Sequence, residues 1–157
     1  MQSIIEAMRK RTSVRTYKKQ QLSETDRNNI EKLLITEQIG PFGNRVRFTL
    51  IDLPIADPQK RRKLGTYGFI RGTSAFIAGA VSRAPGAVVD YGYCLEKIIL
   101  FLANMGIGTC WLGGTFKRSG FEEEIGLSQD ELLPAVTPVG YPADSRSLRE
   151  RMLRTAA

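Results

Sequence analysis

Hydrophobic positions recur along the chain at two different periods, which predict a mixture of helices and strands. Apolar residues three and four positions apart, such as Ile4, Ile5 and Met8, indicate amphipathic helices. A run of β-branched and aromatic residues that ends at proline, as at 46–53 before Pro54, indicates a strand. The predicted helices cover residues 2–11, 58–65 and 88–105, a stretch from the Ser23 cap to about Gln38, and a short turn between Ser128 and Glu131. The predicted strands cover residues 46–53, 75–81, 109–112 and 135–141.

The segment at 88–105 is apolar on nearly every side of its middle turns, with five hydrophobic residues in succession at 98–102 and Gly106 as a stop. A helix of this kind needs burial on all sides. In a chain of 157 residues the simplest second cover is another subunit, although a central helix within one core remains possible. The whole pattern predicts an α+β fold in a single domain over residues 1–157.

The net charge of +7 lies entirely at the two ends of the chain. Residues 1–19 carry a net +5 and residues 141–157 a net +2, so residues 20–140 are neutral. Proteins that bind nucleic acid usually show a broad basic face with aromatic residues that stack on bases, and here only Tyr17 accompanies the N-terminal basic run. A compact anion is the better partner, and nucleic-acid binding through the basic ends is the weaker alternative.

The N-terminal basic run, residues 9–19, holds six cations and three small hydroxyl side chains without an acidic residue. Arginine pairs with phosphate oxygens in two parallel hydrogen bonds, and hydroxyl groups add further donors. The run therefore predicts an anion site. The competing interpretation is a solvated helix end with scattered surface charges. A second basic run at 60–63 is interpreted as such a solvated face.

The absence of histidine excludes most catalytic chemistry that relies on side chains alone, including Ser-His-Asp and Cys-His mechanisms. Cys94 and Cys110 lack CxxC spacing and are expected to be buried small apolar residues. The N-terminus lacks the apolar stretch of a signal peptide, and residues 88–108 contain three charged side chains. We therefore expect a cytoplasmic protein with no membrane segment and no metal site, whose chemistry comes from carboxylates, the backbone or a cofactor.

The glycine-rich stretch at 106–114 fits neither common phosphate-binding loop. A dinucleotide GxGxxG motif would need glycine in place of Trp111, and a P-loop would need lysine in place of Gly114. The stretch is interpreted as a strand that leads into a Gly113-Gly114 turn, whose bare backbone lets a flat ligand approach closely. An ordinary tight turn is an equally good interpretation. Two further loops, 40–45 and 67–72, each carry one candidate cation, Arg45 and Arg71.

In their order along the chain, residues 11–17, 43–45, 85–114 and 137–143 resemble the nitroreductase family of FMN-dependent flavoproteins, within a subgroup of small nitroreductases. The resemblance covers nearly the whole chain, and it depends on the order of the motifs because each motif alone is weak. It implies a homodimer with a central, mostly antiparallel sheet flanked by helices and with FMN at the subunit interface. NADH or NADPH would reduce the flavin by hydride transfer, and the flavin would then reduce a nitroaromatic, a quinone or a similar small-molecule acceptor in a ping-pong cycle. The cofactor would carry this chemistry without a catalytic side chain.

The resemblance also implies which residues hold the flavin. The phosphate would lie at Arg11, Thr12, Ser13 and Arg15, other polar contacts would come from Asn44, Arg45 and Arg71, and the turn beside the flavin N5 would be Leu112, Gly113 and Gly114. Two features depart from the family pattern: Val46-Arg47 replaces a Pro-Trp pair, and the basic tail is short, so that Arg149 and Arg151 would have to replace its cation. A flavin-binding dimer without reductase turnover is the alternative that these departures suggest.

Overall fold

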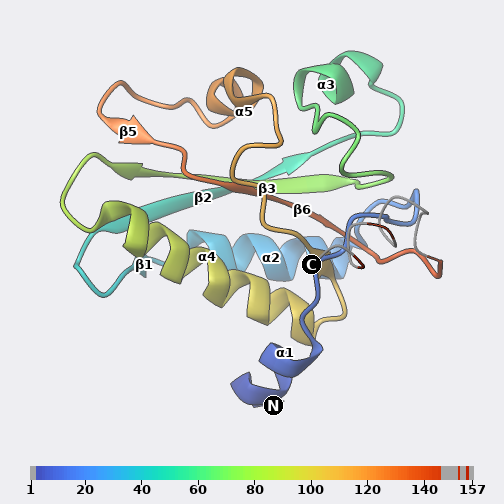
Figure 1. Ribbon diagram of the computed structural model, residues 1–157, viewed down its shortest axis with the longest axis horizontal. Coiled ribbons are helices and arrows are strands. Elements are labelled where there is room, and N and C mark those ends of the chain that lie inside the picture. The colour runs from blue at the N-terminus through green and yellow to red at the C-terminus, as the bar shows by residue number, and fades with distance from the viewer. Residues whose placement is uncertain (1–2, 146–151, 153–154, 156–157) are drawn as a thin grey trace.

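One antiparallel sheet of six strands separates two layers of helices (Figure 1). The computed structural model describes residues 3–145, 152 and 155 of the chain. One face of the sheet is covered by α2 (Glu24–Ile35) and α4 (Ala87–Asn104), and the other by α3 (Pro58–Lys63) and α5 (Arg118–Glu124). The N-terminal helix α1 (Ile4–Lys10) packs against α4 on the side away from the sheet. No helix in the described part of the chain is both long and apolar enough to cross a membrane.

The strands lie in the order β1-β2-β3-β6-β4, and β5 pairs with the end of β3 beside β6. Every pairing between named strands is antiparallel, so the predicted α+β fold with a mostly antiparallel sheet is confirmed. The strands are β1 (Gln38–Ile39), β2 (Arg45–Asp52), β3 (Ala75–Ser82), β4 (Gly108–Thr109), β5 (Glu131–Leu132) and β6 (Val136–Gly140). All residues of β3 except Ser82 are buried, because helices cover both faces of this central strand.

Each face of the sheet has its own hydrophobic core. The core under α2 and α4 includes Tyr91, whose hydroxyl donates to the Ala135 carbonyl at 2.5 Å and accepts from the Gly79 amide at 3.1 Å. Burial raises the pKa of this phenol well above its ordinary value. The core under α3 and α5 holds edge-to-face ring pairs of Phe121 with Phe76 and Phe116. The two cysteines are buried in these cores, as expected from their spacing.

Most predicted helices and long strands are confirmed. The helix predicted to end near Gln38 ends at Ile35 instead, because Thr36 caps it and residues 38–39 form β1 against β2. The predicted turn at Ser128 and Glu131 exists, but Glu131 begins β5 rather than a helical turn. In the predicted strand at 109–112, only Thr109 belongs to a ladder, and Leu112 makes an isolated bridge to Val136.

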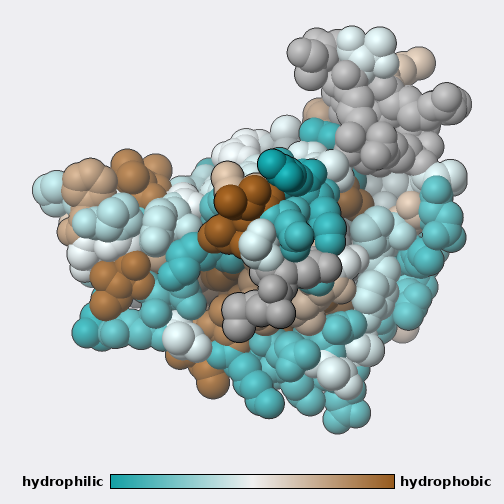
Figure 2. All heavy atoms as spheres, turned by 90° about the horizontal axis from the view of Figure 1, so that it is seen from below, coloured by the Kyte–Doolittle hydropathy of each residue, from teal (hydrophilic) through white to brown (hydrophobic). Residues whose placement is uncertain are grey.

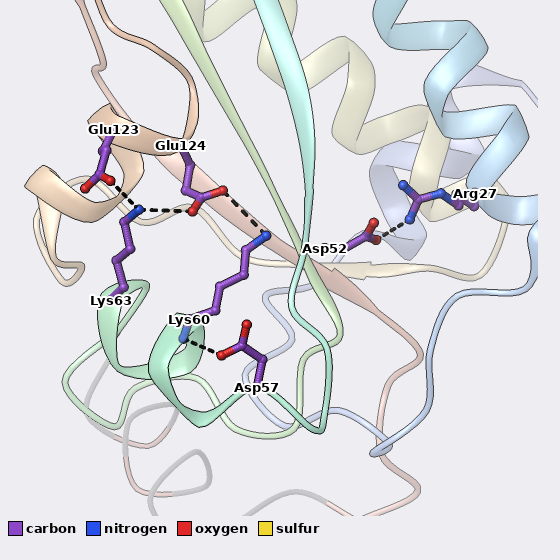
Figure 3. Close-up of polar contacts among 7 residues, drawn as sticks. All are labelled: Arg27, Asp52, Asp57, Lys60, Lys63, Glu123 and Glu124. Atoms are coloured by element: carbon purple, nitrogen blue, oxygen red, sulfur yellow. Dashed lines mark hydrogen bonds and ion pairs between the residues drawn. The ribbon is translucent and has the colours of Figure 1, made fainter.

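The basic run at 60–63 is not simply the predicted solvated face, because two of its cations join α3 to α5 (Figure 3). Lys63 lies 2.9 Å from a Glu123 oxygen and 3.2 Å from a Glu124 oxygen. Lys60 lies 3.5 Å from the second Glu124 oxygen. The carboxylates that make these pairs belong to a helix about sixty positions away in the sequence, so local sequence reasoning did not find them.

A bidentate ion pair fastens β5 to β2. The Arg47 guanidinium donates to both oxygens of Glu131, at 2.9 and 2.6 Å, and also to the Ile125 carbonyl at 2.8 Å. The Arg47 hydrogen bonds lower the pKa of Glu131 to about 2, against the opposing effect of burial and with help from the Ser128 amide. The Val46-Arg47 departure noted in the sequence therefore has a structural role in this protein.

This ion pair predicts a specific loss of stability in acid. Because the pKa of Glu131 is lower in the folded chain, its stabilisation is complete above its ordinary pKa of 4.5 and falls as the pH drops toward 2. We expect Glu131→Gln to lower the free energy of unfolding by about 1–2 kcal/mol at pH 7 and by progressively less below pH 4.5. This range allows for solvent screening, because the Arg47 side chain is partly exposed. Urea unfolding at several pH values measures this. Asp130→Asn, at an exposed neighbouring position, is the control, and equal acid slopes for wild type and Glu131→Gln would contradict the prediction.

Candidate functional site

The N-terminal basic run lies along one end of the sheet, beside two segments that are distant in the sequence. Ser13 makes a parallel bridge with Thr109, and Thr16 makes one with Arg71. The Arg71 amide donates to the Arg15 carbonyl at 2.9 Å, and the Arg71 carbonyl accepts from the Tyr17 amide at 2.8 Å. Three of the predicted site segments therefore meet at one place.

Arg15 and Arg71 share this backbone ladder and carry uncompensated charge. In the part of the chain that the structure describes, neither guanidinium forms an ion pair. Arg15 is partly buried, and Arg71 is exposed. Each of these two arginines lacks a carboxylate partner and is therefore able to attract an anion.

Arg11 differs from Arg15 because it has a counter-ion. Its Nε lies 3.6 Å from Glu96 Oε1, and the other oxygen of Glu96 accepts from the Trp111 indole at 2.8 Å. Glu96 belongs to α4, and sequence reasoning assigned it no role. The available signal was a charged residue within a largely apolar helix. Glu96 thus positions both the basic run and the single tryptophan of the chain.

A pocket of about 160 Å³ opens beside Arg11, between the basic run and the end of α4. Its lining includes the exposed Thr12 and the backbone around Gly106 and Thr109. Gly106 has a φ of 75° and directs the chain out of α4. The Ile107 amide then donates to the Leu102 carbonyl at 3.0 Å, which completes a Schellman motif and delivers β4 to the site.

The predicted glycine turn follows β4 along the same edge of the sheet, beside the opposite end of β6. The amide and carbonyl of Leu112 both pair with Val136 at 3.0 Å, and the Leu112 side chain is buried. Gly113 and Gly114 are exposed, and a Cβ atom on either would have no described neighbour within 4 Å. The backbone here is exposed, and packing against the described residues does not require glycine.

The structure does not bring Asn44 and Arg45 to this site within one protomer. The Asn44 side-chain amide donates to Asp90 at 2.7 Å and to the Pro85 carbonyl at 3.0 Å, at the start of α4. Arg45 pairs with Glu37 at 2.5 Å and is exposed. Asp90 precedes Ala103, which lines the pocket, by thirteen residues, or roughly 20 Å of helix. Sequence reasoning also named Arg149 and Arg151, which lie outside the described residues.

Asp90 holds the loop at 40–44 against α4. Its buried carboxylate accepts from the Phe42 and Asn44 amides, both at 2.8 Å, and from the Asn44 side chain. Burial by itself would raise the pKa of Asp90, but these three donors lower it below its ordinary value. Asn44 is therefore a structural partner of Asp90 in this protomer.

The outer face of α1 and α4 exposes large hydrophobic side chains. Figure 2 shows hydrophobic groups among polar ones on this side of the molecule, seen from below. On α4, Val88, Val89 and Tyr93 are about half exposed and Phe101 is 41% exposed. On α1, the exposed residues are Ile4, Ile5 and Met8, whose spacing predicted the helix. The sheet thus covers only one side of α4.

Comparisons with known proteins agree with this architecture. The family model described as "Putative TM nitroreductase" matches residues 3–156. A protein of Archaeoglobus fulgidus named "Putative NADH dehydrogenase/NAD(P)H nitroreductase" is 26% identical over 164 residues, which cover 96% of this chain and 91% of that protein. A solved Bacteroides thetaiotaomicron protein of the same name superposes with a TM-score of 0.71 at 17% identity, covering 94% of this chain and 90% of its own. A Desulfovibrio desulfuricans protein described as a "putative nitroreductase in complex with fmn" superposes with a TM-score of 0.67 at 21% identity, covering 98% of this chain and 96% of its own.

The open glycine turn can be tested without a ligand. Gly113→Ala should leave the melting temperature unchanged or raise it by about 1–3 °C, because the new methyl group meets open space and the unfolded chain loses entropy. Gly120→Ala is the matched comparison, since its Cβ would lie 2.2 Å from the Lys63 carbonyl oxygen. We expect a fall of roughly 3–8 °C for that variant, measured by circular dichroism. Similar losses for both variants would mean that the turn is packed.

Proposed function

The chain belongs to the nitroreductase family, and from this premise we propose that it binds FMN and transfers electrons from NADH or NADPH to a small-molecule acceptor. The observation that carries the proposal is the pair of uncompensated arginines, Arg15 and Arg71, on segments that meet beside β4, the edge strand that leads into the open Gly113-Gly114 backbone. A chain without histidine suits this function, because the cofactor supplies the redox chemistry.

The described residues fit the chemistry of FMN. A phosphate needs cations and hydroxyl donors, which Arg11, Ser13 and Arg15 supply from one short segment. A flat ring needs a surface without side chains, which Gly113 and Gly114 supply. When bound, FMN would accept a hydride from the nicotinamide and pass electrons on to the acceptor. The backbone N–H groups of the glycine turn would stabilise negative charge at the edge of the ring.

We propose that a second copy of the chain completes this site. The pocket beside Arg11 measures about 160 Å³, below the roughly 300–1,000 Å³ of typical small-molecule sites. A two-fold axis near the exposed face of α1 and α4 would cover the hydrophobic residues there. It would also carry the loop with Asn44 and Arg45 of one protomer toward the basic run of the other.

The acceptor class follows from the family, and we propose nitroaromatics, quinones or similar compounds. A flavin-binding dimer without turnover is the second candidate, favoured by one specific observation. The Asn44 amide is already bound to Asp90 and Pro85, and Arg47 to Glu131, so this loop offers fewer free donors to a flavin. A cytoplasmic location stays a prediction.

The flavin proposal predicts a yellow protein that either nicotinamide bleaches under anaerobic conditions. Arg15→Ala should weaken FMN binding by about 10- to 100-fold, because a charge-assisted contact to phosphate is lost. Lys19→Ala, at an exposed position of the same run, is the matched control. Equilibrium titration followed by flavin fluorescence measures both. A colourless protein that does not take up FMN would refute the proposal, and bound FMN that neither nicotinamide reduces would establish the candidate without turnover.

The subunit proposal predicts a mass of twice the 17.5 kDa chain in solution. Phe101→Glu places a charge in the proposed interface and should shift the protein toward monomer while lowering FMN occupancy, because buried unpaired charge is costly. Ile55→Glu changes a residue of similar exposure, 53%, in the loop between β2 and α3 and should leave the dimer intact. Light scattering after size exclusion distinguishes them. A monomeric wild-type protein with full flavin occupancy would contradict this prediction.

A further inference from the structure

A second cavity of about 330 Å³ lies on the opposite face of the sheet from α4, between α3 and the loop that leads into β3. Its apolar lining includes Leu53, Leu64 and Phe76, which belong to the core on this face. Three cationic residues, Arg61, Arg62 and Lys117, line it as well. No carboxylate occurs among its described lining residues. The cavity therefore combines an apolar wall with concentrated positive charge.

The positive charge arises because the basic run of α3 divides between two environments. Lys60 and Lys63 are neutralised by Glu123 and Glu124 (Figure 3). The other two members of the run, Arg61 and Arg62, line the cavity. Glu123 and Glu124 are thus committed to the lysines, and neither arginine forms an ion pair in the described part of the chain.

Backbone carbonyls position these cations without neutralising them. Arg61 donates to the Leu53 carbonyl at 3.1 Å and to the Pro54 carbonyl at 3.2 Å. Lys117 donates to the Arg62 carbonyl at 2.9 Å, which leaves two of its three N–H donors for other partners. The Arg62 guanidinium is exposed and has no ion pair in the described part of the chain. Such an arrangement matches the oxygens of a phosphate group.

The loop beside the cavity contains the single non-glycine residue with positive φ in the described chain, Tyr67, at 51°. The Phe69 amide donates to the Thr66 carbonyl at 3.0 Å, so Tyr67 lies within a tight turn. Aromatic residues rarely adopt this conformation, and such strain concentrates at ligand sites. The Tyr67 side chain lines the cavity yet is 62% exposed, so its ring is available to a flat partner.

We propose that this cavity binds the phosphate of a phosphorylated nucleoside, with the base on the aromatic side of the cavity. Its volume, near the lower limit of about 300 Å³ for small-molecule sites, suits a mononucleotide-sized group. Ile70 and Gly72 line the cavity on either side of Arg71, which links it to the candidate flavin site. Resting on the proposed function, this identifies the electron donor as NADPH, whose adenosine 2′-phosphate NADH lacks.

The test uses the full-length protein loaded with FMN and titrated calorimetrically with adenosine 2′,5′-bisphosphate, with adenosine 5′-monophosphate and with inorganic phosphate. We expect the bisphosphate to bind at least tenfold more tightly than the monophosphate at ~0.1 M salt, since it brings a second phosphate to the cations. Arg62→Ala should remove about tenfold of this affinity, and Arg62→Lys should recover part of it. Lys32→Ala, an exposed cation on α2, is the control.

A second measurement compares kcat/KM for NADPH and NADH. The preference for NADPH should fall about tenfold in Arg62→Ala and persist in Lys32→Ala. Equal binding of the two adenosine phosphates, equal losses in Arg62→Ala and Lys32→Ala, or competition by inorganic phosphate as strong as the bisphosphate would overturn the nucleotide pocket.

The two proposals fail separately. Selective binding that depends on Arg62, in a protein whose flavin neither nicotinamide reduces, would support the pocket and refute the reductase function. Reduction of the flavin by both nicotinamides with the same kcat/KM, unaffected by Arg62→Ala, would support the reductase and refute the pocket.

Discussion

The helix α4 is the constraint on which the rest of the structure depends, because it is apolar on more sides than one sheet can cover. Its inner side packs against β2 and β3 and fills one of the two cores. At its start, the buried Asp90 carboxylate fastens the loop at 40–44. After its end, Gly106 turns the chain into β4 and toward the basic run. One element thus positions both the loop at 40–44 and the strand beside the basic run, and it leaves a hydrophobic outer face, which we propose a second subunit covers.

The distribution of carboxylates decides which of the many cations remain available for ligands. Lys60, Lys63 and Arg47 are neutralised by acidic residues of the segment that follows the glycine turn, and these pairs join α3 to α5 and fasten β5 to β2. Arg15, Arg71 and Arg62 have no such partner in the described chain. An uncompensated surface arginine costs little in water, whereas it gains strongly from a bound phosphate. The same division of charge therefore separates structural cations from candidate binding cations.

Much of the fold could be predicted because its main elements carry their own pattern. The strands β2 and β3 and the helix α4 are long enough to show a period or a continuous apolar run. The two-residue strands β1 and β5 could not be predicted, since two residues are too few to show a hydrophobic period. They are strands only because each pairs with a neighbouring strand. Within the site, the clustering of Arg11 to Arg15 and the glycine turn were visible in the sequence. The roles of Glu96 and Asp90 were not, because their partners lie far away in the chain.

The sequence by itself determined the class of fold, the long apolar helix and the concentration of charge at the N-terminus, because these follow from composition and local spacing. Only the tertiary structure decided which charges are neutralised and which residues share a site. It joined Arg15 to Arg71, committed Asn44 to Asp90 at the far end of α4, and separated Arg61 and Arg62 from the lysines beside them. The physical reason is that Coulomb and hydrogen-bond energies depend on distance in space, which spacing along the chain does not specify.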